Sequence, residues 1–209
     1  MVGFEYLFEL FTLLLGLAMA EVLAGFANLL KLRARIRASQ DTELDHVRIG
    51  WLVPLLGLVI LLDQSTFWLR MFDMRESLYL SDGMVMLVLA LIGGYYLVSA
   101  LIVPDEPAAW PDFDDYYMQH RRTVIVGALL ISIIATAGQF AMMDTPMAEG
   151  AVEPPEWIVL GSELGELVQF FALIAALFTG SPRISAVLLS LVVAGQLVVG
   201  TLSIATPGY

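Results

Sequence analysis

Six long apolar segments dominate this sequence and restrict its fold more than any other feature. Each has at least about the 20 residues that an α-helix needs to cross a bilayer. A transmembrane β-barrel would instead show short stretches of alternating polarity. We therefore predict an all-α fold, a polytopic membrane helical bundle with six transmembrane helices. The predicted spans are residues 4–31, 49–71, 83–103, 122–143, 156–179 and 183–205.

The connections between these segments are too short to hold a second domain, since soluble domains usually have at least about 50 residues. Hydrophobic residues make up 59% of the chain and charged residues 15%, against roughly 25% charged residues in soluble domains. We therefore predict a single transmembrane domain, residues 1–209, whose main partner is the lipid bilayer. The net charge of -11 argues against a nucleic-acid partner.

The basic residues are distributed unevenly among the five connections, and this predicts the orientation of the chain. Lys and Arg concentrate in connections that stay on the cytoplasmic side of a membrane. Most of the ten basic residues lie in the first, third and fifth connections, namely Lys31, Arg33, Arg35, Arg37, Arg48, Arg121, Arg122 and Arg183. We therefore expect a multi-pass protein of the cell inner (plasma) membrane whose N-terminus and C-terminus both lie outside.

The third connection combines a helix-start signal with an aromatic pattern. Pro111 is followed closely by three aspartates. Proline is favoured in the first helical turn and acidic residues stabilise the positive end of the helix dipole, so a helix should begin here and lead into the fourth span. Trp110, Phe113 and Tyr117 recur at helical spacing. We interpret them either as an aromatic belt at the membrane interface or as a docking loop for a cytoplasmic partner.

Polar side chains interrupt the apolar segments, mostly toward their outer ends. Asp63 stands in the stretch "ILLDQSTFWL", and Tyr95 and Tyr96 add phenolic donors in the third segment. Intramembrane ionisable residues are rare and mark ion paths and proton relays. The residues expected to form an ion or proton site are Asp63, Glu163, Glu166, Gln139, Gln169 and Gln196. Glu21, near the middle of the first segment, is a further candidate intramembrane acid.

The predicted cluster contains carboxylates and amides but no cation. Arg70 lies seven residues beyond Asp63, about 10 Å along a helix, so we expect its side chain to extend outward to the membrane surface. An oxygen-rich site without a cation suits a proton, Na⁺ or a hard divalent ion. The alternative is that these acids and amides hydrogen-bond one helix to another and serve only assembly.

The usual signatures of enzymes and cofactor sites are missing from the sequence. It has no cysteine, and neither histidine has a second one at ligand spacing. Nucleophile elbows, zinc-protease motifs and phosphate-binding glycine loops are also lacking. We therefore expect no enzymatic activity, no cofactor and no metal site.

Two functional hypotheses follow from the polar residues. The first is a proton or cation channel or transporter, with the acids lining an outward-accessible site. The second is a non-catalytic accessory or assembly subunit of a larger membrane complex, with the polar patches joining helices of different chains. In both cases we expect a homo-oligomer or a membrane-protein partner. A sensor whose glutamates titrate is a third possibility.

Overall fold

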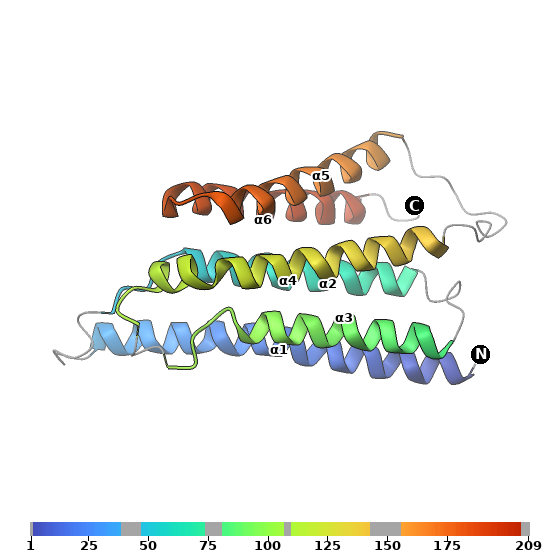
Figure 1. Cartoon of the computed structure of the whole chain (residues 1–209), viewed down its shortest axis with the longest axis horizontal. Helices are drawn as coiled ribbons and strands as arrows, with labels where there is room; N and C mark the ends of the chain where they lie inside the picture. The colour runs from blue at the N-terminus through green and yellow to red at the C-terminus, as the bar shows by residue number, and fades with distance from the viewer. Residues whose placement is uncertain (1, 39–46, 74–80, 107–109, 143–155, 206–209) are drawn as a thin grey trace.

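Six α-helices make up the part of the chain that the computed structural model describes (Figure 1). The described residues are 2–38, 47–73, 81–106, 110–142 and 156–205. The helices are α1 (Val2–Ala38), α2 (Leu52–Asp73), α3 (Asp82–Ala100), α4 (Phe113–Met142), α5 (Glu156–Phe178) and α6 (Pro182–Ala205). All six are long and apolar enough to cross a membrane. This confirms the predicted all-α bundle with six transmembrane helices.

The helices pair into three layers, which Figure 1 shows one above another: α1 with α3, α2 with α4, and α5 with α6. Helix α2 is central, because it contacts α1, α3, α4 and α6. Helix α1 begins and α6 ends at the same end of the bundle (Figure 1), which we call the terminal end. Of the residues predicted to form the ion or proton site, Asp63 lies near the middle of α2, and Glu163 and Glu166 lie in the first half of α5.

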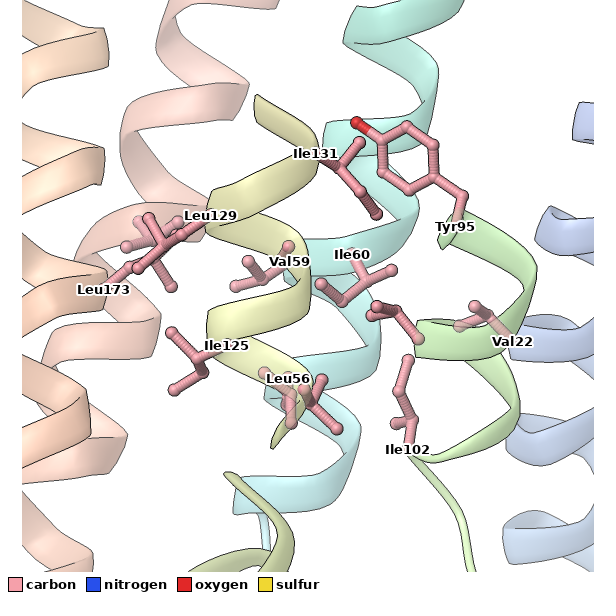
Figure 2. Packing of buried hydrophobic residues seen from close by; sticks show 14 of the residues in the cluster. Val22, Leu56, Val59, Ile60, Tyr95, Ile102, Ile125, Leu129, Ile131 and Leu173 are labelled. Atoms are coloured by element: carbon pink, nitrogen blue, oxygen red, sulfur yellow. The ribbon is translucent and has the colours of Figure 1, made fainter. Parts of the chain in front are cut away.

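The core lies where α2 meets its neighbours. Figure 2 shows Leu56, Val59 and Ile60 of α2 beside Ile125 of α4 and Ile102, which follows the end of α3. All five side chains are buried. Because lipid tails are as apolar as these side chains, the packing gains from close contact between helices rather than from escape from water.

Two helices extend beyond their predicted spans at the end opposite the terminal end. Helix α1 continues past residue 31 to Ala38, and α4 begins at Phe113 rather than at 122. The start of α4 is capped, because Asp112 Oδ1 accepts a hydrogen bond from the Asp114 backbone N–H at 2.8 Å. Such caps satisfy a donor that would otherwise be orphaned in the first turn. The predicted helix start after Pro111 is confirmed.

The prediction of an aromatic docking loop formed by Trp110, Phe113 and Tyr117 is wrong for Phe113 and Tyr117. Phe113 is 0% exposed and Tyr117 is 1% exposed, because this face of the first two turns of α4 points into the bundle. These side chains therefore form neither a surface belt nor a docking surface. Trp110 is half-buried and packs edge-on against Tyr116 and His120.

Candidate functional site

Asp63 contacts α3 from the middle of α2. The Tyr95 hydroxyl of α3 donates a hydrogen bond to Asp63 Oδ2 at 2.8 Å. Figure 2 shows the Tyr95 ring reaching from α3 toward α2 at the edge of the apolar cluster. Tyr95 is itself buried. The carboxylate of Asp63 is thus held at the boundary between α2 and α3 by a phenolic donor.

Gln64 makes the second contact between these two helices. Its Nε2 donates a hydrogen bond to Ser99 Oγ at 2.7 Å, and both side chains are buried. Gln64 Oε1 has no hydrogen-bond partner among the described residues. Ser99 was not among the residues expected to contribute to the site. Its position four residues after Tyr95 could have indicated a role, because this spacing places both side chains on one face of α3.

The rest of the polar stretch in α2 is also satisfied within the chain. The hydroxyls of Ser65 and Thr66 donate to the carbonyls of Leu61 and Leu62, one turn earlier, at 2.9 and 3.0 Å. Such back-bonding lets hydroxyls lie inside a helix without an outside partner. Most of the hydrogen-bonding capacity of residues 63 to 66 is therefore met by helices α2 and α3.

Arg70 does not extend outward to the membrane surface as expected, because it is paired with an acid on α5. Its guanidinium donates a hydrogen bond to Glu166 Oε1 and forms an ion pair that joins α2 to α5. Arg70 is also an electrostatic neighbour of Asp63. The expectation of a cluster without a cation is therefore wrong. The physical reason is that a long, flexible arginine side chain can reach a carboxylate on a neighbouring helix.

Three of the predicted site residues come together around this ion pair. Glu166 binds Arg70 directly, and Gln169, one turn further along α5, is a polar neighbour of the Asp63 carboxylate. Asp63, Glu166 and Gln169 thus meet where α2 and α5 approach each other. Arg70 is therefore already paired with one of these carboxylates, that of Glu166.

Among the described side chains, the other predicted residues form no hydrogen bond or ion pair with this cluster. Glu163 is exposed and has no ion-pair partner among the described residues. Gln196 of α6 is half-buried, and its Oε1 has no hydrogen-bond partner within the described part of the chain. Glu21 is half-buried in α1. Gln139 belongs to α4, but its side chain lies outside the described residues.

Glu163 borders an uncovered apolar face of α5. Five large side chains recur there at alternating spacings of three and four residues, and each is more than half exposed. We call this row the α5 seam: Trp157, Leu160, Leu164, Leu167 and Phe171. Figure 1 shows that the first turns of α5 diverge from the other layers. Glu163 is three residues from Leu160 and four from Leu167, so it flanks the seam.

A hollow of about 390 Å³ lies between α1 and α2, and Ser65 of the polar stretch in α2 lines part of it. Leu15, Gly16, Met19 and Trp68 contribute to its wall. The Thr12 hydroxyl at its edge accepts a hydrogen bond from Trp68 Nε1 at 3.2 Å. The wall is mainly apolar, so this hollow suits a hydrocarbon chain better than an ion.

Comparisons with protein-family models, curated proteins and solved structures find no match. In the described part of the chain, no group of three or more His, Cys, Asp or Glu side chains is placed to hold a metal ion. The chemistry of the site therefore rests on the ion pair, the Asp63–Tyr95 contact and the exposed acid on α5. These features belong to a multi-pass membrane helical bundle.

Proposed function

We propose that this protein is a non-catalytic assembly subunit of a membrane complex and that the α5 seam is its docking face. The observation that carries the proposal is the exposure of Glu163 beside the seam. Exposed leucines alone would be ordinary on a lipid-facing helix. With the orientation that the basic residues predict, this face lies in the outer half of the inner membrane.

The carboxylate of Glu163 is costly to place in a membrane if it stays exposed to lipid. An ionised side chain at the centre of a transmembrane helix costs about 2.5–3.5 kcal/mol on the insertion scale, and such residues almost always face protein or water. Glu9 is exposed as well, but it is the second residue of the membrane span Phe8–Arg37, whereas Glu163 is the fifth residue of the span Val159–Phe178. Glu163 therefore lies further inside its span, where contact with another protein stabilises a carboxylate more.

The test is the mass of the particle that contains the chain in its native membrane. Membranes are extracted with a nanodisc-forming polymer and the particles are analysed by native mass spectrometry. We expect a particle heavier than one chain, and Leu164→Ala with Leu167→Ala should reduce its mass. The matched control is Leu13→Ala with Leu17→Ala, two exposed leucines of α1. One-chain particles throughout, or equal masses in all variants, would refute the proposal.

A second candidate function is proton binding or transfer at Asp63. The supporting observation is a series of ionisable side chains that begins at exposed Glu166. Glu166 forms an ion pair with Arg70, Arg70 interacts electrostatically with Asp63, and Asp63 accepts a hydrogen bond from Tyr95. Because Arg70 already supplies positive charge, a proton fits this site better than a metal cation. Proton flux into proteoliposomes is the test. Asp63→Asn should abolish the flux and Glu9→Gln should leave it unchanged, whereas an absence of flux in the native chain would exclude this function.

A further inference from the structure

The two glutamates beside the α5 seam indicate which charge a protein that binds there should carry. Glu163 is exposed, and the ion pairs of the described residues leave it without a cation. Glu166, one turn away, is already bound to Arg70. An acid at this depth is stabilised by a neighbour that supplies a positive charge. The partner should therefore bring one.

A second copy of this chain is poorly suited to supply that charge. A two-fold contact through the α5 seam would place the Glu163 side chains of both copies near each other, and like charges in a contact are unfavourable. Of the ten basic residues, only Arg70 and Arg75 belong to the last turn of α2 or to the connection between α2 and α3. The other eight belong to the first, third and fifth connections. Arg70 is engaged by Glu166, and Arg75 follows the end of α2.

We infer that the occupant of the α5 seam is a transmembrane helix of a different protein that carries a Lys or Arg level with Glu163. This inference rests on the proposed assembly role. The alternating three- and four-residue spacing of the seam is the pattern of coiled-coil-like packing, in which charged residues that flank the seam determine partner choice. Left-handed crossings of this kind are the commonest in membrane bundles. The seam supplies the contact, and the ion pair supplies the selectivity.

The experiment measures association with a designed probe in vesicles of phosphatidylcholine. The probe is a synthetic transmembrane peptide of Leu and Ala with a single Lys near one end of its apolar stretch, compared with the same peptide carrying Gln. Because the chain has no cysteine, Gly180→Cys gives a unique site for a fluorescent donor. A Cβ at Gly180 meets nothing within 4 Å. Energy transfer to a labelled peptide reports binding.

We expect the Lys peptide to bind about three- to fifteenfold more tightly than the Gln peptide, the range of polar contacts between membrane helices. Glu163→Gln should remove this preference, while Glu163→Asp and the control Glu9→Gln should retain it. Equal binding of the two peptides to the native chain would overturn the inference. Energy transfer between labelled copies of the chain that Leu164→Ala abolishes would also overturn it, because a second copy would then occupy the seam.

The two proposals fail in different ways. If the native particle depends on Leu164 and Leu167 but the Lys peptide has no advantage, the assembly role stands and the basic partner is wrong. If the native particle contains one chain only, the assembly role itself is wrong. Circular dichroism of the Glu163→Gln chain controls for misfolding, since an exposed side chain contributes little to the core.

Discussion

Ser99→Ala should destabilise the protein more than the loss of one hydroxyl suggests. Ser99 Oγ accepts the hydrogen bond of Gln64 Nε2 at 2.7 Å. Gln64 is 0% exposed, and its Oε1 has no other partner among the described residues. Removing the hydroxyl therefore leaves the whole carboxamide buried without a hydrogen bond.

The expected cost is about 1–2 kcal/mol, between the average of about 0.6 kcal/mol for polar contacts in membrane proteins and the 1–3 kcal/mol for a buried unsatisfied group. Gln64→Leu removes the amide and fills a similar volume. The remaining Ser99 hydroxyl can then bond to a carbonyl one turn earlier in α3. In the Gln64→Leu background, Ser99→Ala should therefore cost almost nothing.

Reversible unfolding in mixed micelles with increasing dodecyl sulfate gives the four free energies of this double-mutant cycle. Tryptophan fluorescence and circular dichroism follow the transition. If Ser99→Ala has the same cost with Gln64 and with Leu at position 64, the two side chains do not interact and the argument is refuted. A coupling free energy of about 1 kcal/mol would identify the pair as a structural contact between α2 and α3.

The same unfolding assay checks three further predictions. Arg70→Gln should cost only about 1 kcal/mol or less, because polar contacts between membrane helices contribute about 0.6 kcal/mol on average and the Arg70 and Glu166 side chains are 35% and 55% exposed. Exchanging the two charges should recover the loss, and failure to recover it would contradict the pairing. Gly57→Ala should cost about 1–3 kcal/mol through overpacking, since its Cβ would lie 2.7 Å from Phe26 Cε1. Gly93→Ala, where a Cβ meets nothing within 4 Å, should instead stabilise α3 by about 0.5–1 kcal/mol, and a loss there would contradict the packing described.

The presence and approximate bounds of the six helices can be predicted from sequence because they depend on local properties. A run of about 20 apolar residues is enough to place a helix across a bilayer, whatever surrounds it. The start of α4 after Pro111 is equally local, since it depends on proline geometry and an aspartate cap. Both predictions agree with the structure.

The direction in which each helix faces could not be predicted in this way. A helix that is apolar on all sides has no periodic signal for its buried face. Leu164 of α5 and Leu56 of α2 both lie within predicted spans, yet Leu164 is 60% exposed and Leu56 is 3% exposed. Phe113 and Tyr117 are buried for the same reason, because the neighbours of α4 determine which of its sides is covered.

The candidate site likewise has features that residue order predicts and features that it does not. Because depth along a helix follows from residue number, the similar levels of Asp63, Glu166 and Gln169 could be predicted from the order of residues. The pairing of Arg70 with Glu166 and the exposure of Glu163 arise from the way the helices pack. These outcomes depend on helix tilt and on the reach of a long side chain. Both are set by packing between segments far apart in the chain, which a one-dimensional pattern does not contain.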